Sequence, residues 1–304
     1  LPIEWLVMGY MLLTLLIVLF AYTRVENPQA MIWGRVRIAA TTVALWSAYR
    51  LVPCRFTRAV RVVVQMALLA WWYPDTYEIN RMFPNLDHVF ATWEQQLFGC
   101  QPALFFASTF PSPVVSELMS MGYASYYPMI ALITFFYLFC RYREYERAAF
   151  VVLATFFIYY VIYICVPVAG PTSYYKAGGL QQIGQANFPA VNDYFNTHSD
   201  CLATPGYTDG FFYHMVEDAK AAGERPTAAF PSSHVGVATV IMLLAGHTRN
   251  RRLCLLLLPF FVFLCMSTVY IQAHYVIDAI AGLLTGVLFY FGLMAATRNM
   301  APTR

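Results

Sequence analysis

The sequence predicts an all-α integral membrane protein, and three observations support this prediction. Of the 304 residues, 60% are hydrophobic and only 12% are charged, whereas about a quarter of the residues in an ordinary soluble domain are charged. Uncharged apolar runs of about 18 residues or more, long enough to cross the hydrocarbon layer as helices, recur along the whole chain. Arginines cluster in the short connections between these runs, as topology signals do.

Six apolar runs are predicted to span the membrane, namely residues 5–23, 118–140, 148–168, 228–246, 253–273 and 275–297. The apolar segment 62–74 is shorter than these runs. Arginines can snorkel along its start and an interfacial aromatic belt lies at its end, so this segment is also predicted to span the membrane. Residues 38–49 form a shorter uncharged stretch, which could be an interfacial helix, a re-entrant segment or a tilted span. The first run has no basic region before it and no clear cleavage site, which indicates a retained span.

Three groups of arginines mark one face of the membrane. They are Arg141, Arg143 and Arg147 in one connection, Arg249, Arg251 and Arg252 in another, and Arg298 and Arg304 after the last span. The positive-inside rule makes this face cytoplasmic, so the long connections 75–115 and 171–230 lie outside. The length of the second connection indicates a functional cap. The formal net charge of only +3 gives no indication of a nucleic-acid partner.

The first candidate motif is Phe-Pro-Ser-Ser-His at residues 230–234, which opens the apolar run 228–246. Serine around a first-turn proline is typical of a helix start. The backbone N–H groups at such a start, the hydroxyls of Ser232 and Ser233 and the imidazole of His234 would together form an anion site. Phosphate would suit this site.

The second candidate motif places His274 and Asp278 four residues apart, on one face of a helix. Asp278 lies inside an apolar run, where an ionisable residue is costly and by default indicates function. Its carboxylate would fix the imidazole tautomer and support positive charge on the ring. Because both histidines enter the membrane from the same face, His274 could act as nucleophile while His234 acts as general acid.

Each motif also has a structural interpretation. His234 could be a helix-cap histidine, and His274 with Asp278 could be a hydrogen-bonded pair between helices. Their joint occurrence on one face, with an acid inside the membrane, favours catalysis. A serine nucleophile with His234 as its base is disfavoured because adjacent side chains rarely meet on a helix. No residue supplies a third zinc ligand at a metal-type spacing, so neither a metal nor a cofactor is predicted.

At these residues the chain resembles the type 2 phosphatidic acid phosphatase superfamily, whose signatures read roughly P-S-x-H and S-x-x-x-x-x-x-H-x-x-x-D. Residues 231–234 match the first pattern, and Ser267, His274 and Asp278 match the second. The resemblance implies a six-helix phosphatidic acid phosphatase-type core in residues 58–297. One or two extra N-terminal helices in 1–57 would precede this core, and a cytoplasmic tail, 298–304, would follow it.

The resemblance also implies catalytic roles for three residues. His274 would be the nucleophile that forms a phosphohistidine, Asp278 would support it, and His234 would protonate the leaving group. Further segments resemble the inositol phosphorylceramide synthase branch, which transfers a phospho-headgroup from one lipid to the hydroxyl of another. These segments are Pro-Val-Ala-Gly-Pro at 167–171, residues 270–278, Leu-Asp at 86–87 and Leu-Phe-Gly at 97–99.

The sequence differs from these patterns at the positions where a basic residue would neutralise the phosphate. Thr172 and Thr268 stand where relatives carry arginine. Arg225 and Lys176, two of the few basic residues in the second outer connection, are therefore the candidates, with Arg225 favoured because a guanidinium can bind phosphate in two places near a helix start. Lys220 ranks below them. With Ser232 and Ser233, Arg225 and Lys176 make up the predicted substrate-binding set.

The expected function is a membrane lipid phosphotransferase that moves a phospho-headgroup, phosphoinositol by resemblance, between a phospholipid donor and a lipid acceptor such as a sphingolipid. The alternative is a lipid phosphate phosphatase on the same scaffold. A weaker alternative is a non-enzymatic transporter or lipid-binding membrane protein, because buried His and Asp also occur in proton relays. The expected location is the bacterial inner membrane, with the active site facing the extracytoplasmic side. The oligomeric state stays open.

Overall fold

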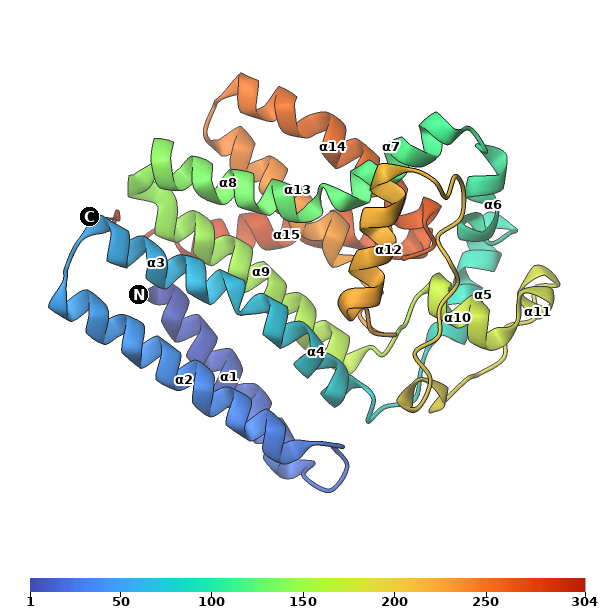
Figure 1. Cartoon of the computed structure of the whole chain (residues 1–304), viewed down its shortest axis with the longest axis horizontal. Coiled ribbons are helices and arrows are strands. Elements are labelled where there is room, and N and C mark those ends of the chain that lie inside the picture. Colours follow the sequence, from blue (N-terminus) through green and yellow to red (C-terminus); the bar gives the residue numbers. More distant parts are fainter. Residues whose placement is uncertain (304) are drawn as a thin grey trace.

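The computed structural model describes residues 1–303, and over that range the chain forms helices and loops with no β-strand (Figure 1). The all-α fold class is thereby confirmed. The α-helices are α1 (Pro2–Phe20), α2 (Pro28–Leu51), α3 (Arg55–Ala67), α4 (Leu69–Asn80), α5 (Asp87–Phe98), α6 (Pro102–Thr109), α7 (Pro113–Ala124), α8 (Tyr126–Cys140), α9 (Tyr145–Cys165), α10 (Pro171–Gly178), α11 (Leu180–Gly184), α12 (Phe211–Gly223), α13 (Ser233–His247), α14 (Arg251–Tyr270) and α15 (Val276–Ala296). Short 3₁₀ turns occupy Tyr142–Glu144 and Tyr194–Asn196.

Within residues 1–303, four helical segments are long and apolar enough to cross a membrane: α1, α9 with the 3₁₀ turn before it, α14 and α15. The pair α7 and α8 adds a fifth if it is taken as one span, bent by 47° between Ala124 and Tyr126. The apolar helix α13 is shorter, with 15 residues, because the chain immediately before Ser233 forms a loop. Together these segments make the chain a multi-pass membrane protein.

The N-terminal segment forms two helices rather than one. Residues 38–49, which the sequence left open, lie within α2, whose 24 residues extend about 36 Å. This helix runs antiparallel to α1 (Figure 1). The predicted span 62–74 covers parts of α3 and α4, which are separated only by Leu68.

Buried ion pairs attach these N-terminal helices to α3 and α4. Arg35 of α2 donates to both carboxylate oxygens of Asp75 at 2.9 and 2.7 Å, and Arg61 of α3 donates to both oxygens of Glu4 at 2.7 and 2.6 Å. Charges in an apolar environment need such pairing because an unpaired buried charge is very costly. The pairs explain how charged residues are accommodated among these helices.

Close packing of α13 against α15 brings the two histidine motifs together. A Cβ atom on Gly282 would stand 2.4 Å from the carbonyl oxygen of Ser232, and one on Gly286 would stand 2.5 Å from the carbonyl oxygen of Gly236. Small residues allow membrane helices to approach this closely. The starts of both helices therefore lie side by side.

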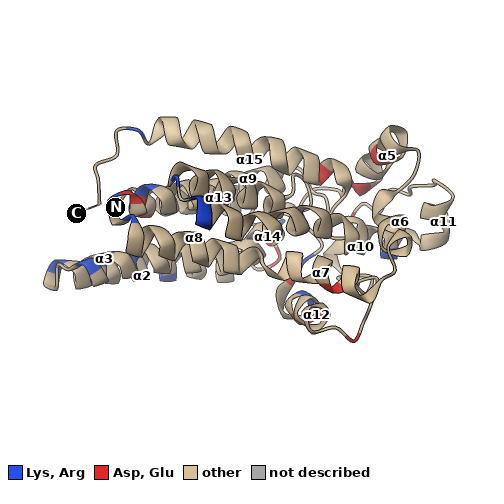
Figure 2. Ribbon diagram, turned by 90° about the horizontal axis from the view of Figure 1, so that it is seen from above, with Lys and Arg blue, Asp and Glu red and all other residues tan. Residues whose placement is uncertain are grey.

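The two ends of the helix bundle differ in charge. Figure 2 shows most Lys and Arg residues at the end that holds both termini, while acidic residues are more frequent at the opposite end, near α5 and α7. The connections 75–115 and 171–230 supply α5, α6 and α10 to α12, which lie at that opposite end (Figure 1). The N-termini of α13 and α15 point towards this second end.

Candidate active site

His234 lies in the first turn of α13, which begins as the sequence predicts. Ser232 is the N-cap residue, and its hydroxyl accepts a hydrogen bond from the backbone N–H of Val235 at 3.3 Å. This contact satisfies one of the N–H groups that a helix start leaves without a partner. Ser232 is fully buried, so its hydroxyl has a capping role in this structure.

The side chain and backbone of Ser233 have different partners. Its backbone N–H donates to the hydroxyl of Tyr163 at 3.0 Å, and that hydroxyl donates in turn to the carbonyl oxygen of Pro231 at 2.9 Å. The Ser233 hydroxyl is half-buried, lies beside the hydroxyls of Tyr126 and Tyr163, and caps no backbone N–H group within residues 1–303. Of the two predicted serines, Ser233 therefore has the hydroxyl available to a substrate.

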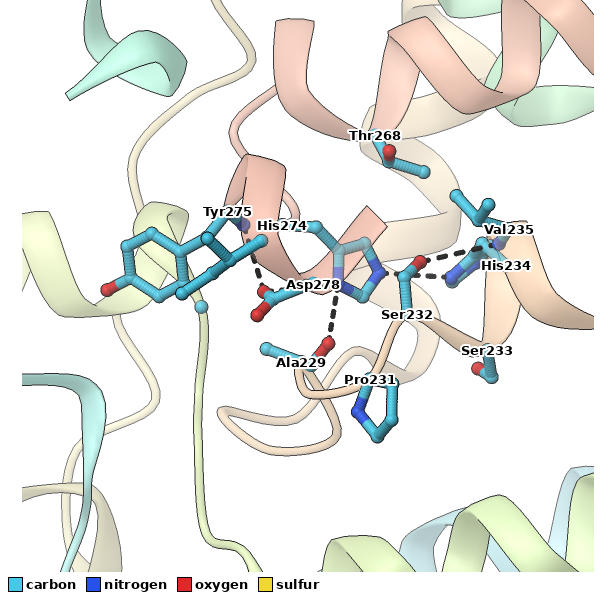
Figure 3. A network of polar contacts seen from close by, with 12 residues as sticks. Ala229, Pro231, Ser232, Ser233, His234, Val235, Thr268, His274, Tyr275 and Asp278 are labelled. Atoms are coloured by element: carbon cyan, nitrogen blue, oxygen red, sulfur yellow. Dashed lines mark hydrogen bonds and ion pairs between the residues drawn. The ribbon is translucent and has the colours of Figure 1, made fainter. Parts of the chain in front are cut away.

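His274 lies in the tight connection between α14 and α15. Its backbone N–H donates to the carbonyl oxygen of Thr268 at 2.9 Å, and Gln272 adopts a left-handed backbone conformation that reverses the chain. Burial leaves only 4% of His274 exposed. The imidazole thus has a fixed environment, which Figure 3 shows.

The two nitrogens of the His274 ring have separate partners (Figure 3). Nδ1 lies 2.8 Å from the carbonyl oxygen of Ala229, and Nε2 lies 3.4 Å from Nδ1 of His234. Because a carbonyl oxygen can only accept, Nδ1 carries the proton and donates it. Burial lowers the pKa of His274 to about 4, so the ring is neutral at pH 7 and Nε2 presents a free lone pair towards His234.

Asp278 is fully buried but does not make the contact expected of it. Its Oδ2 lies 3.7 Å from Nδ1 of His274, beyond hydrogen-bond distance, and instead accepts from the backbone N–H of Tyr275 at 2.9 Å. The tautomer of His274 is fixed by the Ala229 carbonyl and not by the carboxylate. At this distance the carboxylate can still stabilise a positive charge on the ring.

His234 is held by two aromatic rings at the break between α7 and α8. The ring centroid of Tyr123 lies 4.7 Å from that of His234 in a stacked arrangement, and the centroid of Tyr126 lies at 4.4 Å. Tyr123 is the next-to-last residue of α7 and Tyr126 the first of α8. The bend therefore presents both rings to the imidazole and restricts its orientation.

The basic residues predicted to bind phosphate make no hydrogen bond to the two histidines within residues 1–303. Lys176 on α10 and Arg225 after α12 are exposed, and within residues 1–303 neither side chain makes a hydrogen bond or an ion pair. The ammonium group of Lys220 donates a hydrogen bond to the hydroxyl of Thr204 at 2.6 Å and forms an ion pair with Glu217 at 3.3 Å.

The two threonines at which the resemblance led us to expect arginine, Thr172 and Thr268, are buried. Thr172 donates to the carbonyl oxygen of Leu202 at 3.2 Å, and Thr268 donates to that of Cys265 at 3.0 Å. The sequence did not single out Glu224, an acidic residue whose charge acts on His274. Burial raises the pKa of Glu224, and the positive charge of Lys220 opposes that rise.

Other contributors to the site carry weak sequence signals. Ala229 acts through its carbonyl group, which every residue possesses, and Tyr123 and Tyr126 belong to an aromatic excess typical of membrane interfaces. Asp87 and Glu94 of α5 are fully buried and bind backbone N–H groups next to the motifs. Within residues 1–303, no three His, Cys, Asp or Glu side chains are grouped as metal ligands.

The fold and the two facing histidines define an all-α membrane protein of the phosphatidic acid phosphatase type. A family model described as the PAP2 superfamily matches residues 88–291, more than half of the chain, and the chain belongs to this superfamily. It is therefore a lipid enzyme of the phosphatase or phosphotransferase type. Neither the curated proteins nor the solved structures contain a significant match.

Proposed function

We propose that the protein is a lipid phosphotransferase that moves a phospho-headgroup between lipids through a phosphohistidine at His274. The observation that carries this proposal is the orientation of the His274 ring. Nδ1 donates to Ala229 at 2.8 Å, which leaves the lone pair of Nε2 directed towards His234. A neutral, oriented nucleophile beside a second imidazole is what covalent phosphoryl transfer requires.

In the first step, Nε2 of His274 attacks the phosphorus of the donor phospholipid and forms an N–P bond. The P–O bond to diacylglycerol breaks, and His234 gives a proton to the leaving oxygen. A bound phosphodiester is negatively charged, which favours the protonated form of His234 that this step needs. Asp278, at 3.7 Å from Nδ1, stabilises the positive charge that develops on the His274 ring.

In the second step, the hydroxyl oxygen of the acceptor lipid attacks the same phosphorus. The N–P bond breaks, the electron pair returns to Nε2 of His274, and His234 takes the proton of the hydroxyl. The products are the exchanged phospholipid and the original enzyme. Water in place of the acceptor would give free headgroup phosphate, so the identity of the attacking hydroxyl separates a transferase from a phosphatase.

The charges around the histidines favour a phosphodiester donor over a phosphate monoester. A monoester carries about 1.5 to 2 negative charges at pH 7, whereas a phosphodiester carries one. Within residues 1–303, no Lys or Arg side chain makes a hydrogen bond or ion pair with His234, His274 or Asp278, and the charge of Glu224 acts on His274. A second uncompensated negative charge in this buried site would be costly.

Phosphatidylinositol is the donor that the resemblance to inositol phosphorylceramide synthases suggests, and ceramide or another sphingolipid is the acceptor. We expect purified enzyme given headgroup-labelled phosphatidylinositol and ceramide to form mainly inositol phosphorylceramide, with free inositol phosphate as a minor product. Matched reactions omit ceramide or contain phosphatidic acid. Release of phosphate or headgroup phosphate as the main product, whatever the acceptor, would establish the phosphatase alternative. If no donor gave turnover or phosphohistidine, the result would favour the non-enzymatic alternative, a transporter or lipid-binding membrane protein.

We also propose that the active site faces the extracytoplasmic side of a bacterial inner membrane, because the arginine-rich end would be cytoplasmic. Two exposed native cysteines allow a test: Cys201 in the connection 171–230 and Cys54 between α2 and α3. In single-cysteine variants, Cys201 should react with a membrane-impermeant thiol reagent added to intact cells, and Cys54 should react only after permeabilisation. The opposite pattern would invert the proposed orientation.

A further inference from the structure

Helix α5 carries two buried acids on one face. Glu94 follows Asp87 by seven residues, close to two helical turns, so their side chains project in the same direction. Both are fully buried, although α5 belongs to an outer connection. Neither side chain forms an ion pair with a Lys or Arg in residues 1–303. Glu94 accepts from two backbone N–H groups, and Asp87 accepts from two backbone N–H groups and from the side chains of Asn85 and Tyr275. Such groups satisfy a buried carboxylate when no cation is present.

Glu94 holds the start of α15. Its Oε1 accepts from the backbone N–H of Val276 at 3.1 Å, and its Oε2 accepts from that of Ile277 at 3.2 Å. These are the first two residues of α15, whose N–H groups have no partner within the helix. The helix dipole adds to the attraction for a carboxylate. Glu94 therefore fixes the backbone two and three residues after His274.

Asp87 holds the segment on the other side of His274. Its two oxygens accept from the backbone N–H groups of Ala169 at 2.6 Å and Gly170 at 2.9 Å. It also accepts from the hydroxyl of Tyr275 at 3.1 Å. One carboxylate thus joins the segment 167–171 to the residue that follows His274.

The segment held by Asp87 reaches both His274 and its acceptor. The backbone N–H of Ala229 donates to the carbonyl oxygen of Val168 at 3.0 Å, and Ala229 is the residue that accepts from Nδ1 of His274. Gly170 has a φ of 94°, and a Cβ there would stand 2.6 Å from the carbonyl oxygen of Ala273. Displacement of this segment would therefore move the carbonyl group that orients the imidazole.

We propose that Asp87 and Glu94 are positioning residues that together set the direction of Nε2 of His274. This inference rests on the proposed function. Glu94 acts through the start of α15, and Asp87 acts through the segment 168–170 and Ala229. A misplacement of about 1 Å at a reacting atom can cost on the order of 10²-fold in rate without weakening substrate binding.

The chain contains a matched control for Glu94. Glu117 of α7, which is half-buried, binds the first turn of α12 in a similar way, accepting from the backbone N–H groups of its second and third residues, Phe212 at 3.1 Å and Tyr213 at 3.0 Å. The first turn of α12 carries none of the three catalytic candidates. Replacing either glutamate by glutamine removes the charge and places an amide donor where two N–H groups need acceptors.

The test compares Glu94→Gln with Glu117→Gln in steady-state lipid transfer and in the rate of phosphohistidine formation after rapid mixing. We expect Glu94→Gln to lower kcat and the phosphohistidine rate by about 10- to 100-fold, with KM for the donor within about twofold of the parent value. Glu117→Gln should keep kcat within about twofold. Folded protein is quantified in each sample, and rates are given per folded molecule.

Three results would overturn the inference: a normal kcat per folded molecule in Glu94→Gln, an equal loss in Glu117→Gln, or a loss confined to KM. If Glu94→Gln does not fold, Asp87→Asn decides by the same criteria, and failure of both to fold assigns these acids a purely structural role. The parent enzyme tests the proposed function separately, because phosphohistidine must form there first.

Discussion

Replacing His274 by Ala is expected to abolish turnover, lowering kcat by on the order of 10⁴-fold or more. The variant lacks the nitrogen that would form the N–P bond, and no neighbouring group can substitute for it. His234 is the nearest imidazole, but its ring packs against Tyr123 and Tyr126 and lacks the carbonyl partner that orients His274. Radiolabelled donor should therefore leave no base-stable, acid-labile phosphate on the variant protein.

The control for this experiment is His214→Ala, which removes an exposed histidine on α12. Both variants should be equally folded by thermal denaturation, and only His274→Ala should lose activity. Near-normal turnover in His274→Ala would disprove its role as nucleophile. Phosphate bound to another histidine in the variant would move the nucleophile to that residue.

The sequence predicted the general arrangement of the site because helix-start chemistry and membrane topology are local signals. Ser232 caps α13 as its position before the apolar run indicates. His274 precedes α15 and so does not share a helix face with Asp278 as expected, but its Nδ1 still lies 3.7 Å from Oδ2 of Asp278, and the packing of α13 on α15 brings His234 within 3.4 Å of His274. These outcomes follow from spacing and from the direction of each span.

The partners of these residues depend on loop paths that no spacing encodes. A carboxylate at i+4 was the natural acceptor for the imidazole, yet the long connection returns to the site and presents the carbonyl group of Ala229 instead. Arg225 and Lys176 were selected because basic residues are few in that connection. Composition gives no direction for a side chain, and both are exposed in the structure.

The signal from α5 was present in the sequence but ambiguous. Two acids seven residues apart in a connection are most often a solvated helix face, and only the packing of α5 shows that both are fully buried. The same limit applies to the N-terminal helices. Arg35 and Asp75 form an ion pair across forty residues of sequence, and this pairing makes a buried charge acceptable in α2.

Replacing His234 by Ala is expected to lower kcat by about 10²- to 10⁴-fold with a natural phospholipid donor, because diacylglycerol leaves as a poor alkoxide unless it is protonated. The size of this loss should depend on the leaving group. With a phosphodiester that releases an acidic phenol, no proton is needed at the leaving oxygen, so His234→Ala should recover most of its first-step rate. His274→Ala should remain inactive with both donors.

The measurement is the burst of phenol released in the first turnover, followed with parent, His234→Ala and His274→Ala enzymes at equal concentrations of folded protein. A burst near the parent rate in His234→Ala, together with slow transfer from the natural donor, would establish proton donation as the role of His234. An equal loss with both donors would assign His234 to binding or to orientation of His274, to which its ring lies 3.4 Å away. The contrast between the two histidines is decisive because they share one site and would act on different bonds.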